Sequence, residues 1–338
     1  MPRDSATARQ VGLHLGGPIQ IPSTLPNQLA KIRTGGRVTG SLHTAHHLFH
    51  DSFAMATSFW AQAHGPILTL LFRDTRTQHA CLARVESYYE SEKHAGKYLT
   101  WDEAHRERLC KGYEAFNLPL STVAEWLASM RAQVEKPKEV LDKEAASTKQ
   151  KTSSDPIHDP DEPFWHAHCS AQERELIAEL TRRGILDGCG TLASSAPCMY
   201  LISATLTQAD AALAHERLHA LYYFSPKYRD LLAIQWNSLP RAIASAIELD
   251  LKMRGYKPSV WQDELGAYLG IRVNGTSSRR SDPSNEFGNK SAATCAEIRQ
   301  VLLQQIPQCW KQDVGMDEAG VTLTGQDLEC AKHAFSNA

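Results

Sequence analysis

A long segment of polar and charged residues divides the chain and limits where a core can form. Between Glu135 and Pro163 the sequence is rich in Lys, Glu, Asp, Ser, Thr and Pro and holds no aromatic residue. Such a segment has too little apolar surface to offset the entropy lost on folding, so we predict a linker or a mobile insertion. The division leaves an N-terminal part (1–134), a C-terminal part (164–310) and a tail (311–338). A single domain that carries the segment as an insertion is the alternative.

The composition limits the classes of partner. The 338 residues are 42% hydrophobic, which is typical of a globular protein. Lys and Arg total 36 against 38 Asp and Glu, and the resulting net charge of −2 argues against nucleic acid as a partner. The longest largely apolar run, Pro66–Phe72, is too short to cross a bilayer, and no signal peptide is visible after Met1. We therefore expect a cytoplasmic protein without membrane contact.

The apolar spacing predicts helices and one hairpin in the N-terminal part. Residues Ser41–Ala63 show the period of an amphipathic helix. Two runs rich in β-forming residues follow, Ile67–Phe72 and Ala80–Tyr88, and the polar residues between them indicate a two-stranded hairpin. Helices are predicted over Trp101–Phe116 and Ser121–Val134, and Ser121 is the predicted N-cap of the second.

The C-terminal part reads as one strand among helices. The strand, Met199–Ala204, is a short apolar run that follows a glycine-rich break. Helices are predicted after a capping box at Ser170, from Thr207 to Phe224, from Leu231 to Met253 with a break at Pro240, from Trp261 to Leu269 and from Ala293 to Ile306.

The helix that begins at Thr207 carries a His-Glu-x-x-His motif. Residues four apart lie on one face of an α-helix, so His215 and His219 can both present a ring nitrogen to one metal ion. Glu216 then lies beside the ion without binding it. This spacing suits a zinc-activated water next to a general base.

A catalytic zinc site needs a third protein ligand and an open position. The predicted helix Trp261–Leu269 offers Glu264 in an otherwise apolar segment, and Asp263 competes with it for the same role. The strand Met199–Ala204 directly precedes the motif helix, where it can form a sheet edge for an extended substrate. The fold class that we predict is α+β and predominantly helical, with a small N-terminal hairpin and a C-terminal edge strand beside the active-site helices.

These residues resemble the zincin metallopeptidases, and in particular the gluzincin branch, in which a Glu on a later helix is the third zinc ligand. The resemblance covers residues 199–270. It implies Zn²⁺ bound by His215, His219 and Glu264, with Glu216 as general base and acid. It also implies a tyrosine that hydrogen-bonds to the transition state, for which Tyr223 and its neighbour Tyr222 are candidates. The predicted function is a zinc-dependent hydrolase that acts on a peptide or amide bond of a peptide or small-molecule substrate.

Two further hypotheses belong to other classes. The segment that begins at Gln262, Gln-Asp-Glu-Leu-Gly, resembles a degenerate form of the acidic Asp-Asp-x-x-Glu box of fungal arginine-containing cyclodipeptide synthases, and it lacks the first Asp and the last Glu. In that case Asp263 and Glu264 contact an aminoacyl group instead of zinc, and transfer RNA is a partner. The third hypothesis is a catalytically silent interaction protein.

Overall fold

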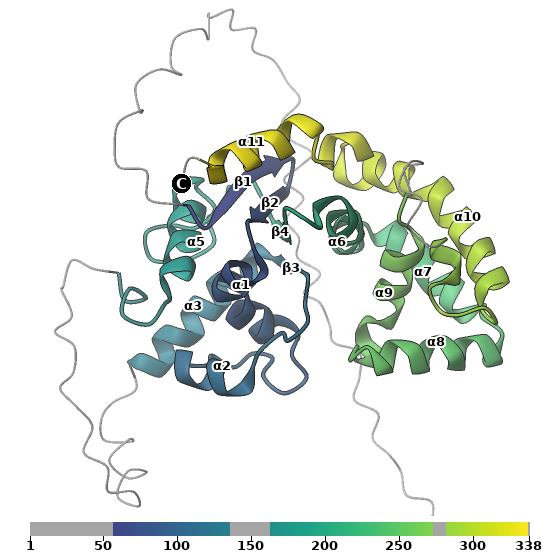
Figure 1. Ribbon diagram of the computed structural model, residues 1–338, viewed down its shortest axis with the longest axis horizontal. Helices are drawn as coiled ribbons and strands as arrows, with labels where there is room; N and C mark the ends of the chain where they lie inside the picture. The colour runs from purple at the N-terminus through teal and green to yellow at the C-terminus, as the bar shows by residue number, and fades with distance from the viewer. Residues whose placement is uncertain (1–56, 136–162, 273–281, 337–338) are drawn as a thin grey trace, which may run out of the picture. The chain divides into compact units, whose positions relative to one another are not determined.

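A small mixed sheet lies at the centre of the structure, which is a computed structural model that describes residues 57–135, 163–272 and 282–336 (Figure 1). Its strands are β1 (Phe59–His64), β2 (Ile67–Phe72), β3 (Ala115–Pro119) and β4 (Tyr200–Thr205), in the order β1-β2-β4-β3. The two inner strands, β2 and β4, are parallel, and each outer strand is antiparallel to its neighbour. The sheet therefore joins strands from both sides of the segment 136–162.

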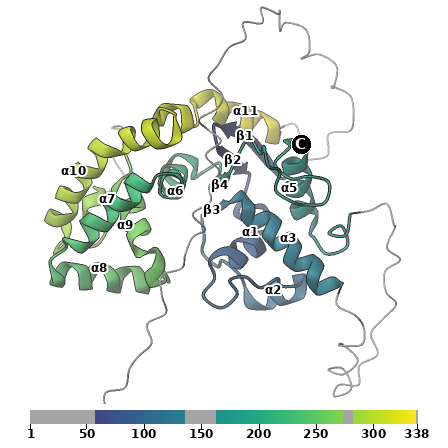
Figure 2. The same ribbon diagram turned by 180° about the vertical axis from the view of Figure 1, so that it is seen from behind.

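The two faces of the sheet bury different sets of helices. Successive side chains of a strand point to opposite faces, so Leu68 and Leu70 of β2 lie in one apolar cluster while Ile67 and Leu71 lie in the other. The first cluster includes side chains of α1, α3 and α5, and the second includes those of α6 to α10. Figures 1 and 2 show the two groups of helices on opposite sides of the strands. A sheet covered on both faces explains why all six residues of β2 are buried.

Helices make up most of the described residues, which confirms the predicted α+β, predominantly helical class. The helices are α1 (Thr75–Glu90), α2 (Trp101–Glu107), α3 (Leu120–Val134), α5 (Ala171–Arg182), α6 (Ala209–Phe224), α7 (Pro226–Asn237), α8 (Arg241–Met253), α9 (Trp261–Leu269), α10 (Ala292–Cys309) and α11 (Gly325–Ser336). Short helical turns cover 258–260, 283–285, 310–314 and 318–321.

Several predicted helices are confirmed. The capping box at Ser170 opens α5, and the helix over 261–269 has the predicted bounds. Pro240 divides 231–253 into α7 and α8 because its ring and its missing N–H prevent helix continuation. The predicted caps at Thr207 and Ser121 are wrong: α6 follows Gln208 and α3 follows Pro119, and neither of these residues makes a side-chain cap.

The predicted hairpin of residues 67–72 and 80–88 is wrong. Residues 80–88 belong to α1, which Asp74 caps by accepting a hydrogen bond from the Thr77 N–H at 2.8 Å. The hairpin is instead β1 and β2, joined by a two-residue turn in which Gly65 has a φ of 56°. Residues 59–63 are thus a strand, whereas we predicted a helix over 41–63; residues 41–56 lie outside the described part of the chain.

Two other predictions about the sheet are corrected. The predicted helix over 101–116 ends at Glu107, where Arg108 has a φ of 52°, and its last two residues belong to β3. The strand near 199–204 is not a sheet edge, because β4 pairs with β2 on one side and β3 on the other. The free edge on this side of the sheet belongs to β3.

The domain limits stay predictions, and the segment 136–162 lies outside the described residues. The described residues all belong to one compact unit. Within the described residues, no helix combines the length and the apolar character needed to cross a membrane.

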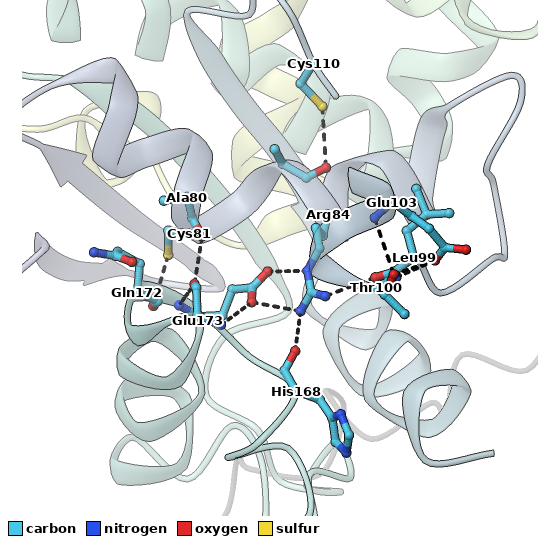
Figure 3. A network of polar contacts seen from close by, with 12 residues as sticks. Ala80, Cys81, Arg84, Leu99, Thr100, Glu103, Cys110, His168, Gln172 and Glu173 are labelled. Atoms are coloured by element: carbon cyan, nitrogen blue, oxygen red, sulfur yellow. Dashed lines mark hydrogen bonds and ion pairs between the residues drawn. The ribbon is translucent and has the colours of Figure 1, made fainter. Parts of the chain in front are cut away.

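A buried ion pair joins α1 to α5 (Figure 3). The Arg84 guanidinium donates two hydrogen bonds to the Glu173 carboxylate, at 2.7 and 2.8 Å, and two more to the carbonyls of Leu99 and His168. Glu173 also accepts the Ser170 N–H at 2.7 Å, as part of the α5 capping box. Both side chains of the pair are almost fully buried. A buried charge is tolerated only with such complete pairing.

We predict that Arg84→Met destabilises the protein by about 3–5 kcal/mol. Met keeps most of the apolar stem, but it leaves the Glu173 carboxylate buried without its counter-charge. Denaturant unfolding followed by circular dichroism measures the change.

The matched control is Lys332→Met, which breaks the solvent-exposed pair between Lys332 and Glu329. It should cost less than about 1 kcal/mol. Equal losses in the two variants would contradict a structural role for the buried pair.

Candidate metal centre

Two adjacent helices bring the motif and its predicted third ligand together. α6 packs against β4, β3 and α9, so its motif face points toward the first turn of α9. His215 and His219 lie one turn apart on α6, and Glu264 lies in the first turn of α9. The apolar residues that flank the motif, Leu218 and Leu221, are buried in the core and fix the rotation of α6.

The potential ligand atoms converge on one point. The Nε2 atoms of His215 and His219 are 3.1 Å apart. A Glu264 oxygen lies 3.6 Å from the Nε2 of His215, and the other lies 3.7 Å from the Nε2 of His219. All three ligand atoms lie within 4.8 Å of one another, so the group can hold one metal ion.

Asp263 occupies a different position from Glu264. Its Oδ2 lies 2.9 Å from the Nδ1 of His219, on the far side of that ring from the Nε2 atoms. A carboxylate in this place accepts the Nδ1–H and leaves the Nε2 lone pair directed at the metal position. The geometry therefore favours Glu264 as the ligand and Asp263 as the group that orients His219.

The donor set fits a divalent cation. Glu264 is 5% exposed, and its Oε2 has no hydrogen-bond partner within the described residues. Burial opposes the charge on Glu264, but His219 and His215 outweigh that effect and lower the pKa of the carboxyl. A buried, ionised carboxylate beside two imidazoles supplies the two nitrogens and one oxygen of a catalytic zinc site.

The same cluster shifts the pKa of His219. Burial disfavours the imidazolium, but Asp263 and Glu264 outweigh it and raise the pKa of His219 well above its usual value. A metal ion must displace this proton before it can bind Nε2, so metal binding by this residue releases a proton.

A polar chain from the sheet holds Glu216. The Asn117 side-chain N–H donates to the Glu216 carboxylate at 2.7 Å, and the Tyr200 hydroxyl donates to the Asn117 Oδ1 at 2.5 Å. Burial raises the pKa of Glu216, and the two motif histidines and Asn117 oppose that rise. One oxygen of Glu216 is thus fixed by β3 while the carboxyl stays close to the metal-ligand group. A carboxyl whose pKa burial raises is suited to exchange a proton with a substrate or a water molecule.

A cavity of about 610 Å³ gives access to this group. His215, Glu216, His219 and Glu264 line it, together with residues of α1, β3 and the segments around α9. Asp263 does not line it, which agrees with its place behind His219.

The predicted tyrosines do not reach the cavity. Neither Tyr222 nor Tyr223 lines it; Tyr223 packs its ring against Tyr200 at a centroid distance of 5.1 Å. Two other tyrosines do line the cavity, Tyr256 and Tyr268, whose hydroxyls are 3.1 Å apart. The Tyr268 ring also packs edge-on against His215. These two tyrosines are therefore the better placed hydrogen-bond donors.

Asn117 and Tyr200 are not among the predicted site residues. Both come from strands, and a period-2 pattern in β3 gave the available signal: Asn117 stands between the buried Phe116 and Leu118. A polar side chain that faces the opposite way from two core residues needs a partner on that face. The prediction of a helix over 101–116 conceals this period-2 pattern, because residues 115 and 116 fall at the end of that helix.

Comparisons with known proteins identify no relative. No protein-family model matches the chain, and neither a curated protein nor a solved structure matches it.

We predict that the ligand and orienting residues differ in their effect on zinc affinity. His219→Ala or Glu264→Ala should abolish stoichiometric binding, because each removes one of three ligands. Asp263→Asn should weaken binding about 10- to 100-fold, as expected for loss of a group behind a ligand. Titration against a chromophoric chelator measures the affinities.

His105→Ala is the control, because His105 is an exposed histidine on α2. It should bind zinc like the unmodified chain. Stronger loss in Asp263→Asn than in Glu264→Ala would reverse the assignment of the two carboxylates.

Proposed function

We propose that the protein is a zinc-dependent hydrolase of peptide or amide bonds. One observation carries the proposal: the ligand atoms of His215, His219 and Glu264 converge in a cavity beside the buried Glu216 carboxyl. A metal site on its own supports storage or structure as well as catalysis. A cavity that admits a substrate and a carboxyl held for proton transfer support hydrolysis in particular.

Different residues of the chain would perform the separate steps of such a reaction. When bound, zinc supplies Lewis acidity that polarises a carbonyl and acidifies a water molecule. Glu216 accepts the proton of the attacking water and then donates a proton to the leaving amine. Asn117 keeps one Glu216 oxygen in a fixed direction, and Tyr256 or Tyr268 can donate a hydrogen bond to the oxyanion.

The free edge of β3 offers a place for an extended substrate. Ala115 and Asn117 of β3 line the cavity together with the metal-ligand group, and β3 is an outer strand of the sheet. An extended peptide can add to such an edge through main-chain hydrogen bonds. This edge takes the role that we predicted for residues 199–204.

The cyclodipeptide synthase and interaction-protein hypotheses require different contacts around α6 and α9. Contact with an aminoacyl group needs Asp263 free, whereas Asp263 is within 2.9 Å of the His219 Nδ1. A silent interaction protein gives no reason for two buried carboxyls, Glu216 and Glu264, beside two histidines, because each buried carboxyl carries a desolvation cost. Both hypotheses predict that zinc does not bind with one-to-one stoichiometry.

We predict that Glu216→Gln retains one zinc per chain and lowers the turnover number by at least about 100-fold. The amide keeps the shape of the side chain and its contact with Asn117 but cannot accept a proton. Elemental mass spectrometry measures the metal, and cleavage of a blocked peptide library measures the turnover.

The matched control is Glu125→Gln on α3, an exposed glutamate outside the cavity. It should leave both quantities unchanged. Undiminished turnover in Glu216→Gln, or a zinc-loaded wild-type chain that cleaves no member of the library, would contradict the proposed function.

A further inference from the structure

The metal-ligand cavity has a second acidic wall, formed by α1. Glu86 and Glu90 lie one turn apart near the end of this helix, and both line the cavity together with the α6 and α9 residues. They take no part in the proposed metal binding or proton transfer. Their presence therefore needs a separate explanation.

One carboxylate oxygen of Glu86 is buried without a hydrogen-bond partner. The residue is 2% exposed, and the oxygen without a partner is its Oε2. Within the described residues, neither the Glu86 nor the Glu90 carboxylate has an ion-pair partner among Lys, Arg or His. A desolvated carboxylate without a counter-charge destabilises a protein unless another molecule supplies the charge.

Lys257 and His219 oppose the rise in the pKa of both carboxyls, but their close polar contacts are with other groups. The Lys257 ammonium donates to the main-chain carbonyl of Glu90 at 3.0 Å. Arg254 binds the carboxylates of Asp250 and Glu286. Lys111 is exposed to solvent at the rim of the cavity. The protein thus leaves the two carboxylates of α1 facing a space that a cationic group can enter.

Burial raises the pKa of both the Glu86 and the Glu90 carboxyl. The pKa of Glu90 rises to about 7, with further contributions from nearby charges, and the pKa of Glu86 rises well above the usual value. A bound cation favours the ionised form of each carboxyl and thereby offsets this shift.

The Glu86 and Glu90 carboxylates also line a second cavity. It has a volume of about 340 Å³, and Tyr113 and Tyr256 line both this cavity and the first. The two glutamates therefore lie where the cavities meet. A group that extends from the metal-ligand group into the second cavity passes both carboxylates.

We propose that Glu86 and Glu90 form a substrate subsite for an ammonium or guanidinium group. This inference rests on the proposed function for its substrate, and it assigns that substrate to the class of basic peptides. The cationic group belongs either to a Lys or Arg side chain or to a free α-amino group. Two carboxylates one turn apart can bind either cation with charge-assisted hydrogen bonds.

Binding and cleavage are measured separately on the full chain. The probes are blocked alanine hexapeptides in which Arg, Lys or norleucine takes each position in turn, and one unblocked alanine hexapeptide. Calorimetric titration uses the zinc-supplemented Glu216→Gln chain, which is designed to bind without turnover. Cleavage rates use the wild-type chain.

The Arg or Lys peptide should bind roughly 10- to 100-fold more tightly than the norleucine peptide at one position. Adding Glu86→Gln or Glu90→Gln should reduce this preference to less than about threefold, while the norleucine peptide keeps its affinity. Glu125→Gln is the matched control and should change neither affinity. Thermal unfolding checks the fold of each variant, and the half-buried Glu90 gives a second test if Glu86→Gln unfolds.

The outcomes separate the two proposals. A cation preference that Glu86→Gln removes, together with no cleavage by the wild-type chain, supports the subsite and contradicts the hydrolase. Cleavage without any preference between Arg, Lys and norleucine contradicts the subsite alone. Tighter binding of the unblocked peptide, lost in Glu86→Gln, supports the subsite and assigns it to the α-amino group. Two zinc ions per wild-type chain and one in Glu86→Gln would overturn it in favour of a second metal site.

Discussion

The Arg84–Glu173 pair fixes the helix on which one wall of the candidate site depends. Four charge-assisted hydrogen bonds leave the Arg84 guanidinium, and they hold α1 against α5 and the loop before α2. Residues two apart in an α-helix point to opposite sides. Glu86 therefore faces away from this pair, toward the cavity. A buried ion pair on one side of α1 thus orients the buried Glu86 carboxyl on the other.

The candidate site is built from two parts of the chain that have different tasks. All three potential metal ligands, and the Asp263 that orients one of them, come from α6 and α9, after the segment 136–162. Asn117, Glu86 and Glu90 come from β3 and α1, before that segment. The parallel pairing of β2 with β4 brings the two parts together. In the proposed function, the later part would hold the metal, while the earlier part would position Glu216 and line the cavity.

Local patterns selected three residues whose potential ligand atoms lie within 4.8 Å of one another in the structure. The i, i+4 spacing of His215 and His219 and the carboxylates of 261–269 depend only on helix geometry. The choice between Asp263 and Glu264 does not follow from helix geometry alone, because it depends on the rotation of α9 against α6. Residues 80–88 of α1 wrongly suggest a strand, because a short, largely apolar run is compatible with either a strand or a helix unless the N-cap, Asp74, is recognised. The edge position of β3 and the role of Asn117 depend on pairings between distant residues, which no local pattern contains.

The pairing register of β3 has a consequence for how the site can fail. Asn117 is paired with Ile202 of β4, and this register alone turns its amide toward Glu216. A slip of one residue would exchange the two faces of the strand and present Phe116 or Leu118 to α6. The metal ligands on α6 and α9 would keep their places. Under the proposed function, metal binding and catalysis therefore depend on different elements, so a one-residue insertion in β3 would remove the contact to Glu216 and leave the potential metal ligands in place.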